Sequence, residues 1–317
     1  MTAIKRHEIP IAIRALKTAN IYEIFSNRHI LVDTGMSPET IPYLEQRGVD
    51  LASLDMVIMT HLHIDHIGGA EAIHKEYNIP LAMGIEDIRR VDQIRESPES
   101  FQKFLMSFMT LNGTPEGILT KMVSHHSVLD NIGTYKDIDF EIKLKGNEKV
   151  DDGISVIHNP GHSPGSMSVY IENDGKLLTG DHLLPGITPN ISFYDENSDM
   201  LGLYMDSLKK TLKLEPNEIL PGHRDPFGNS AERVHRILKH HDERLGQILL
   251  AVKEWKTAYE VARIIPWSKG RTLDSMNLLE MNFAIGEAIS HLRHLTIDGN
   301  AEKRERNGLV EFRSVQT

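Results

Sequence analysis

The sequence predicts an α+β protein, because strand patterns occupy two separate parts of the chain and helical patterns lie between and after them. In the strand patterns, short apolar runs are bounded by turn residues. In the helical patterns, apolar residues recur every three or four positions. This order predicts sheets that pack against helices, with a small further domain at the C-terminal end.

The first strand patterns surround a turn and lead into an apolar run. The expected elements are a β-hairpin with strands at 21–25 and 29–33, a short helix at 41–45, a strand at 56–60 and a helix at 70–74. The run at 56–60 is continuously apolar, which is typical of a buried strand.

The stretch from about Glu86 to Thr134 has a different character, and we expect a helical insertion there. Its apolar residues recur at roughly helical spacing: Ile88, Val91, Ile94, Phe101, Phe104, Leu105 and Phe108. Five side chains of the insertion are expected to lie in its core: Phe101, Phe104, Met106, Phe108 and Met109. The alternative is that they form a wall of the pocket for an acyl chain.

Strand patterns return after the insertion, and helices follow. The expected elements are strands at 140–144, 154–157, 168–171 and 176–179, a helix at 200–212, a strand at 218–220, helices at 230–255, 258–265 and 278–295, and a charged hairpin at 299–312. The last helices and the hairpin have the order of a winged helix. We therefore predict a main domain at 1–243 and a winged-helix-like domain at 244–317.

Composition limits the chemistry and the partners. The chain has no cysteine, so any metal must be bound by nitrogen and oxygen atoms. Its 17 histidines are many, and several cluster. The net charge of −10 disfavours nucleic acid as a partner of the whole surface. No apolar run approaches the length of a membrane span, and the N-terminus has no signal-peptide pattern, so we expect a cytoplasmic protein without membrane contact.

One motif stands directly after the apolar run at 56–60. His61, His63, Asp65 and His66 form the pattern H-x-H-x-D-H. Imidazole nitrogens and a carboxylate suit zinc, iron and related divalent ions. A loop held by a buried strand can keep such ligands in a fixed geometry. The motif therefore predicts a metal site.

The motif resembles that of the metallo-β-lactamase superfamily, whose fold is an αββα sandwich with ligands gathered at one edge of two sheets. The resemblance implies a later histidine, aspartate and histidine, and these are present: His162 in Asn159–Gly165, Asp181 in Thr179–His182 and His223 in Leu220–His223. Val32-Asp33-Thr34-Gly35 looks like the first characteristic segment of the superfamily, where the aspartate is structural. The glycine before each of the three later ligands allows the backbone to approach an ion.

The resemblance also implies a role for each residue. His61, His63 and His162 would bind one ion, Asp65, His66 and His223 would bind a second, and Asp181 would bridge the two. Zinc is the expected metal, with manganese, iron or cobalt as alternatives. A hydroxide shared by the ions would attack a carbonyl or phosphoryl centre. Asp65 would orient this nucleophile and pass a proton to the leaving group, and Asp33 or Ser163 would brace the imidazoles.

Single residues narrow the implied reaction. The lack of cysteine excludes the β-lactamases that use a thiolate ligand, and His63 stands where flavodiiron oxidoreductases usually have glutamate. A mononuclear iron enzyme such as a sulfur dioxygenase remains an alternative. The expected reaction is hydrolysis of a small-molecule ester, thioester or lactone, as in relatives similar to glyoxalase II and acyl-homoserine lactonases. In the segment at 183–194, Tyr194 is a candidate to hydrogen-bond the substrate carbonyl.

The C-terminal domain adds two alternatives. Proteins similar to the β-lactamase-like endoribonucleases also have a winged helix, so the chain could be a metal-dependent phosphodiesterase whose winged helix contacts RNA. Four basic residues would serve this role, Lys303, Arg304, Arg306 and Arg313, but Glu302, Glu305 and Glu311 interleave with them. The preferred role of this domain is to form a homodimer or to close the pocket. The remaining hypothesis is that the whole protein is a non-enzymatic winged-helix regulator.

Overall fold

The computed structural model describes residues 2–13, 16–125, 132–195 and 197–315. The chain divides into two units, and neither is continuous in sequence. The first unit contains Met1–Arg95, Asn131–Pro189 and Asp206–His235, and the second contains Glu96–Asp130, Asn190–Met205 and Arg236–Thr317. Residues 126–131, within the predicted insertion, lie outside the described residues.

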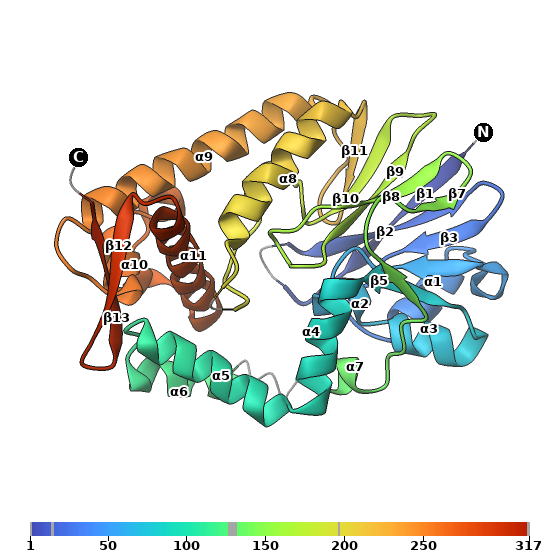
Figure 1. Ribbon diagram of the computed structural model, residues 1–317. Helices are drawn as coiled ribbons and strands as arrows, with labels where there is room; N and C mark the ends of the chain where they lie inside the picture. Colours follow the sequence, from blue (N-terminus) through green and yellow to red (C-terminus); the bar gives the residue numbers. More distant parts are fainter. Residues whose placement is uncertain (1, 14–15, 126–131, 196, 316–317) are drawn as a thin grey trace. The chain divides into compact units, whose positions relative to one another are not determined.

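Two mixed sheets form the first unit (Figure 1). The six-stranded sheet has the order β1 (Ala3–Pro10), β2 (Thr18–Phe25), β3 (His29–Val32), β4 (Met56–Ile58), β5 (Leu81–Gly84) and β6 (Ile142–Leu144). The five-stranded sheet has the order β11 (Glu218–Pro221), β10 (Lys176–Gly180), β9 (Met167–Ile171), β8 (Ile154–His158) and β7 (Lys149–Asp151). Strands β3 to β6 run parallel to one another, as do β10 and β11, and the other neighbours are antiparallel.

The two sheets share one apolar core. Ile24 and Ile58 of the first sheet belong to the same buried cluster as Val156 and Val169 of the second. Because side chains alternate across a strand, every second residue of these strands faces this core. The sheets therefore pack face to face as a β-sandwich.

Helices flank the sandwich. They are α1 (Thr40–Glu45), α2 (Ile64–Ile67), α3 (Ala70–Tyr77), α4 (Ile85–Glu96) and α7 (Ile132–Lys136), with a 3₁₀ turn η1 (Leu51–Ser53). Two further helices are divided between the units: the first unit contains α8 (Met200–Leu214) from Asp206 onward and α9 (Ser230–Ala251) as far as His235, and the second unit contains the rest of both. Figure 1 shows α1 and α3 beside the six-stranded sheet. On the other side, the Ser207 hydroxyl of α8 donates a hydrogen bond to Pro160 O at 2.8 Å, in the loop after β8. The αββα order predicted from the family resemblance is thus confirmed.

The second unit joins the middle of the predicted insertion to the C-terminal part. Its elements are α5 (Pro98–Leu111), α6 (Glu116–His125), α10 (Ala258–Ile264), α11 (Leu278–Ile297), β12 (Ala301–Arg306), β13 (Leu309–Ser314) and the 3₁₀ turns η3 (Ser268–Gly270) and η4 (Leu273–Ser275). Met109 of α5 and Leu119 of α6 share a core with Val261 and Ile285 of α10 and α11. Phe101, Phe104, Met106 and Phe108 are only partly buried.

The C-terminal helices begin at well-formed caps. Thr257 and Asn277 each accept a hydrogen bond from the backbone of a glutamate three residues later, and that glutamate bonds back to the cap residue. Such reciprocal capping satisfies amide groups that the first helical turn leaves unpaired. The backbone at Gly113 (φ +90°) approaches Thr257 so closely that a Cβ there would lie 2.5 Å from the Thr257 hydroxyl. The turn between α5 and α6 therefore requires glycine at this position.

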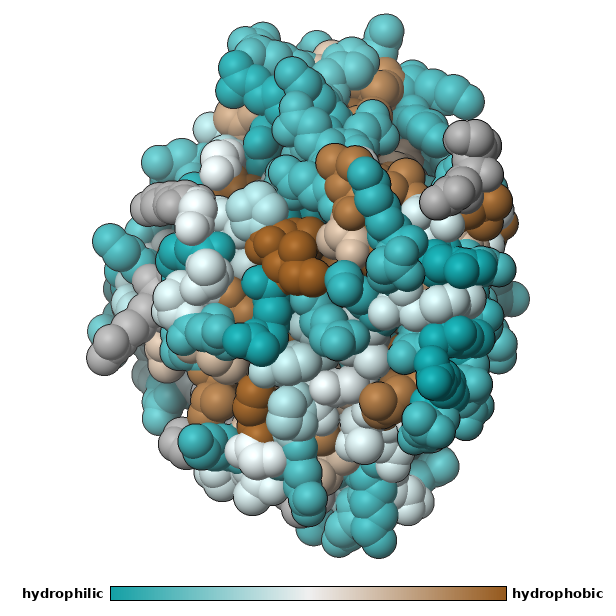
Figure 2. Space-filling model, turned by 90° about the vertical axis from the view of Figure 1, so that its left-hand side faces the viewer, coloured by the Kyte–Doolittle hydropathy of each residue, from teal (hydrophilic) through white to brown (hydrophobic). Residues whose placement is uncertain are grey.

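Exposed apolar residues distinguish the two units. Among the residues that the structure describes, the large apolar side chains that are exposed lie in the second unit: Leu203, Leu250, Ile264, Phe283, Ile297 and Val315. Figure 2 shows one face of the molecule, on which hydrophobic patches are separated by hydrophilic surface. Within the described ranges, no helix is long and apolar enough to cross a membrane.

Two differences from the prediction have a physical cause. The expected strands have counterparts, but β1, β5 and β7 were not predicted: β1 is mostly exposed and charged, and β5 and β7 are too short to show a period. The helix expected at 230–255 ends at Ala251, because the following backbone pairs with β13: Lys256 and Phe312 exchange backbone hydrogen bonds of 3.0 and 2.8 Å.

Candidate metal centre

Strand ends in the first unit position the predicted ligands. His61 and His63 follow β4, and Asp65 and His66 lie on the short helix α2. The other three each follow the end of a strand of the second sheet: His162 after β8, Asp181 after β10 and His223 after β11. Loops anchored by a rigid sheet can hold side chains in a fixed arrangement. The seven predicted residues are therefore held by the sandwich itself.

Three imidazoles form the first group of candidate ligands. His63 Nδ1 lies 3.0 Å from His61 Nε2 and 3.0 Å from His162 Nε2. The three nitrogen atoms lie within 4.8 Å of one another, as expected of side chains that could bind one ion.

The second group combines imidazole and carboxylate. His223 Nε2 lies 3.3 Å from Asp65 Oδ2 and 3.4 Å from Asp181 Oδ1. His66 Nε2 lies 3.5 Å from Asp181 Oδ1. The other oxygen of Asp181, Oδ2, faces the first group at 3.7 Å from His162 Nε2. Asp181 thus presents one oxygen to each group.

Buried atoms without hydrogen-bond partners show that the second group fits a cation. Such atoms include His66 Nε2, Asp181 Oδ1 and His223 Nε2, all within the second group. An unsatisfied buried polar atom is costly, and a divalent ion would satisfy all three at once. The buried groups are therefore consistent with a dinuclear metal site whose ligands are nitrogen and oxygen atoms.

The histidine pKa values differ between the two ligand groups. Burial, with the neighbouring His162, lowers the pKa of His63 to about 3, and burial holds the pKa of His61 well below its usual value. Both imidazoles are then neutral, which is the form that binds a metal. Burial also lowers the pKa of His66, but Asp33, Asp65 and Asp181 outweigh it and raise that pKa to about 10. The carboxylates in and beside the second group therefore favour a positive charge at this position.

Glycines give the backbone room beside the ligands. A Cβ on Gly222 would lie 2.8 Å from both His66 Cε1 and Asp181 Oδ1, so a side chain there would displace two candidate ligands. A Cβ on Gly180 would lie 2.5 Å from the Thr60 hydroxyl. These close contacts explain why glycine precedes Asp181 and His223: a larger residue would not fit at either position.

Asp33 braces the second group, as the sequence suggested. Its carboxylate accepts hydrogen bonds from His66 Nδ1 at 2.7 Å, from the Thr60 amide at 2.7 Å and from the Thr60 hydroxyl at 2.9 Å. The backbone of Asp33 has a positive φ of 64°, a region that residues other than glycine seldom adopt. His223 Nδ1 bonds to Thr18 O at 2.6 Å. Both bonds orient an imidazole so that Nε2 faces the centre.

Ser163, the other residue suggested as a brace, makes its side-chain hydrogen bonds to groups other than the imidazoles. Its hydroxyl donates to Asp87 Oδ2 at 2.6 Å and contacts the Ser166 hydroxyl at 2.7 Å. The Asp87 carboxylate is buried, and sequence analysis missed it. An acidic residue in the first turn of a helix is common, because it favours the helix dipole, so nothing in the sequence set Asp87 apart.

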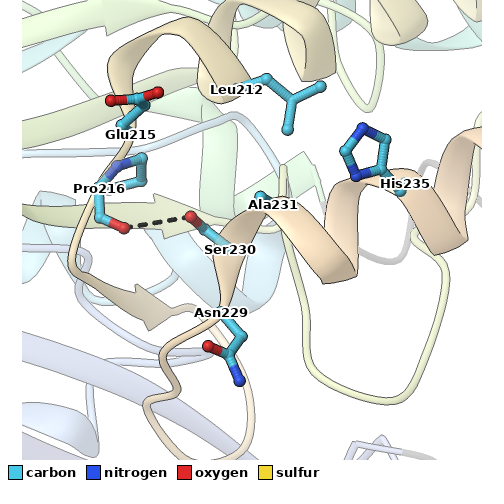
Figure 3. A pocket seen from close by; sticks show the side chains of 7 residues that line it. All are labelled: Leu212, Glu215, Pro216, Asn229, Ser230, Ala231 and His235. Atoms are coloured by element: carbon cyan, nitrogen blue, oxygen red, sulfur yellow. Dashed lines mark hydrogen bonds between the residues drawn. The ribbon is translucent and has the colours of Figure 1, made fainter.

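Two further features lie outside the seven-residue cluster. Tyr194, the second predicted catalytic residue, belongs to the second unit and is half-buried, so its role stays a prediction. Figure 3 shows the residues that line an open hollow, with the hydrogen bond from the Ser230 hydroxyl to Pro216 O. The volume of this hollow is about 600 Å³. Its lining is Leu212, Glu215, Pro216, Asn229, Ser230, Ala231 and His235, and contains none of the seven. This hollow is not the metal centre.

Fold and site together define a class of protein: a two-sheet sandwich, flanked by helices, in which loops after the strands gather histidine and aspartate into groups that could bind metal. Comparison with known families agrees with this. Residues 16–223 match the metallo-beta-lactamase superfamily, and residues 245–315 match its "metallo-beta-lactamase-like, C-terminal domain".

Individual proteins are similar over most of the chain. The Beta-lactamase-like protein 2 homolog of Drosophila melanogaster is 27% identical over 245 residues, which are 74% of this chain and 68% of that protein. An acyl-coenzyme A thioesterase of Bos taurus is 25% identical over 72% of this chain and 80% of its own length. The crystal structure of a metallo-beta-lactamase family protein from Thermus thermophilus has the same fold, with a TM-score of 0.82, 23% identity and 98% of each chain covered.

The chain therefore belongs to the metallo-β-lactamase superfamily. Within that superfamily it is a metal-dependent hydrolase, as its buried histidine and aspartate groups indicate.

Proposed function

We propose that the protein hydrolyses a small-molecule ester, thioester or lactone with the help of two divalent ions. Zinc is the preferred metal. The proposed ligands are His61, His63, Asp65, His66, His162, Asp181 and His223. One observation carries the proposal: the two oxygens of Asp181 face different groups of ligands, at 3.7 Å from His162 Nε2 and 3.4 Å from His223 Nε2. A single carboxylate between two sets of imidazoles is suited to a pair of neighbouring ions.

The residues of the centre would have different roles in the reaction. When bound, the two ions supply positive charge and lower the pKa of water towards neutrality. His61 and His63 stay neutral because burial lowers their pKa, so each keeps a lone pair for coordination. Asp181 and Asp65 supply the negative charge that offsets the ions.

Asp65 is the proposed proton carrier. Burial raises the pKa of Asp65, but His66 and His223 outweigh burial and hold that pKa below its usual value, so the carboxylate is ionised at neutral pH. Its Oδ2 faces His223 at 3.3 Å, and Oδ1 would orient the attacking water and accept its proton. In a thioester, the new C–O bond forms, the C–S bond breaks, and the sulfur leaves with the proton that Asp65 accepted.

The substrate class is proposed from similarity and from surface charge. The similar protein of Bos taurus is named an acyl-coenzyme A thioesterase, which favours a thioester. RNA is less favoured, because two hairpin cations are already paired: Arg304 lies 2.6 Å from Glu311, and Arg313 lies 2.6 Å from Glu302. Neutralised cations contribute little to binding of phosphates.

The domain at 244–317 is proposed to be winged-helix-like. Its order of α10, α11 and the β12–β13 hairpin supports this, and so does the match of 245–315 to a C-terminal domain of the superfamily. Exposed apolar side chains in the same unit support a dimerisation role, of the kind proposed from the sequence.

A parallel assay tests the proposed reaction. Purified protein is incubated with a short-chain acyl-coenzyme A, a lactone, a phosphodiester and single-stranded RNA, before and after removal of metal by a chelator and return of zinc, manganese or iron. We expect hydrolysis of the thioester or lactone that is lost with the metal and restored by it. Cleavage of RNA alone would contradict the proposal.

Asp65→Ala separates an enzyme from a regulator. We expect the variant to fold, to retain at least one ion and to lose at least about 100-fold in kcat, within the range for a general acid or base. Circular dichroism checks the fold, and element analysis checks the metal. A regulator whose sandwich only binds a ligand would show no turnover to lose.

A further inference from the structure

Asp87 is a buried carboxylate whose hydrogen-bond donors, among the residues that the structure describes, are neighbours of the first ligand group and not a histidine. It lies in the first turn of α4 and is fully buried. Its Oδ2 accepts hydrogen bonds from the Leu62 amide at 2.9 Å and from the Ser163 hydroxyl at 2.6 Å. Its Oδ1 accepts one from the Gly165 amide at 2.6 Å.

These three donors belong to the two loops that carry the first ligand group. Leu62 stands between His61 and His63, while Ser163 and Gly165 come directly after His162. One carboxylate therefore ties the backbone between His61 and His63 to the loop just after His162. The hydrogen bonds are charge-assisted and short, so they also fix the direction of each loop.

Close packing leaves these loops little freedom around Asp87. A Cβ on Gly165 would lie 2.4 Å from the Asp87 amide, and a Cβ on Gly84 would lie 2.0 Å from Gly165 O. Side chains at either glycine would push α4 away from the loop that carries His162. The sequence thus provides glycine where the helix and the loop touch.

Burial of this carboxylate is costly. It raises the pKa of Asp87 to about 6, although Ser163, Gly165 and Leu62 lower it by hydrogen bonding. An apolar side chain would avoid that cost but would leave three donors of the ligand loops unsatisfied. A buried charge at this position is therefore best explained by the geometry that it maintains.

We propose that Asp87 is a positioning residue that sets the separation of His61, His63 and His162 and so the affinity of the first ion. This inference rests on the two-ion centre of the proposed function. Asp33 provides the counterpart for the second group, but it acts by direct contact with His66 at 2.7 Å. Asp87 acts one step further away, through the backbone.

Metal affinity tests the inference without reference to turnover. Wild type, Asp87→Ala and Asp92→Ala are loaded with cobalt(II), and each ion is then titrated away with a chelator while the visible absorption of the bound cobalt is recorded. Asp92 lies on the same helix, is half-exposed and pairs with Arg95 at 2.7 Å, so its variant is a matched control. For Asp87→Ala we expect one of the two ions to bind about 10- to 100-fold more weakly, as for other residues that support metal ligands.

The control and a comparator identify the ion that is lost. Asp92→Ala should bind both ions as wild type does. Asp33→Ala should weaken the other ion, with a different change in the cobalt spectrum, because the second group contains carboxylates. Equal binding of both ions by Asp87→Ala and wild type would overturn the inference alone, whereas fewer than two ions in wild type would overturn the proposed function.

A milder variant covers the case in which Asp87→Ala does not fold. Ser163→Ala removes one of the three hydrogen bonds and leaves the buried charge with two. We expect a loss of about 2- to 10-fold for the same ion, the effect of a single hydrogen bond. Unchanged affinity in a folded Ser163→Ala would also contradict the positioning role.

Discussion

The two units each bury a cluster of histidines, and only one of these clusters is suited to metal. In the first unit, imidazoles and carboxylates alternate, with His66 and His223 within 3.5 Å of Asp181. In the second unit, His241 Nδ1 and His291 Nε2 lie 3.1 Å apart. Groups of three candidate ligands were found, among the described residues, only in the first unit.

The difference lies in where the negative charge is. In the second unit, Glu287 lies 3.5 Å from Arg244, so a cation is already present beside the carboxylate. His291 Nδ1 bonds to Glu287 O at 2.7 Å, and burial lowers the pKa of His291 to about 3. This cluster is neutral without a metal. A high count of histidines therefore indicates a metal site only where carboxylates share the same space.

The largest effect should follow from Asp181→Ala, because this side chain faces both ligand groups. We expect loss of at least one ion per chain and a fall in kcat of more than about 100-fold, beyond the usual range for residues that only support ligands. Element analysis of the purified variant and the hydrolysis assay measure both effects. His291→Leu, in the other cluster, should retain two ions. Equal loss of metal in Asp181→Ala and His291→Leu would contradict the conclusion that only the cluster of the first unit is suited to metal.

A medium effect is expected from pH on the second unit. Because burial lowers the pKa of His291 to about 3, its neutral form is the one that folds. The unfolded chain takes up a proton near pH 6.5, so stability is complete above that pH and falls as the pH decreases from about 6.5 towards 3. Between pH 7 and pH 5 the loss should be about 2 kcal/mol for this histidine.

Tryptophan fluorescence measures this loss in one unit only, because Trp255 and Trp267 both lie in the second unit. Urea unfolding at pH 7, 6 and 5 should show a falling midpoint in wild type and a weaker fall in His291→Leu. A midpoint that is equally flat in both proteins would contradict the assignment of a neutral buried imidazole.

The clustering of the candidate ligands could be predicted because these residues stand in short sequence motifs. His61, His63, Asp65 and His66 stand together in sequence, and the later ligands follow strand ends that a sandwich brings to one edge. The partners that support them could not be predicted in the same way. Asp33 was found through a family segment, but Asp87 contacts Gly165, which is 78 positions further along the chain. Such a contact depends on packing, which a local pattern does not record.

The fold shows the same limit. Strands with clear apolar runs were predicted, while β5, of four fully buried residues, has too few positions to show its period. The helical pattern after Glu86 was correct, but nothing local shows that Met109 and Leu119 share a core with Val261 rather than with the sandwich. Which helices pack together is decided by surfaces that lie far apart in sequence.

The smallest effect should come from the hairpin, where polar contacts are at the surface. The Arg304 guanidinium lies 4.1 Å from the ring centre of Trp255 and pairs with Glu311 at 2.6 Å. Exposed pairs and cation–π contacts each contribute up to about 1 kcal/mol, so Arg304→Ala should lower the stability of the second unit by about that amount. Lys303→Ala removes an equal charge from the opposite face of β12 and should change stability less.

Fluorescence-monitored urea unfolding compares the two variants, and binding of single-stranded RNA by both gives the hairpin a second test. If the hairpin contacts no RNA, neither variant changes RNA binding, and metal content stays at the wild-type value in both. A fall in RNA affinity for Lys303→Ala and Arg304→Ala alike would instead show that the second unit recognises phosphates. That result would shift the proposed function from small acyl substrates to phosphodiesters, because the same two-ion centre can attack either.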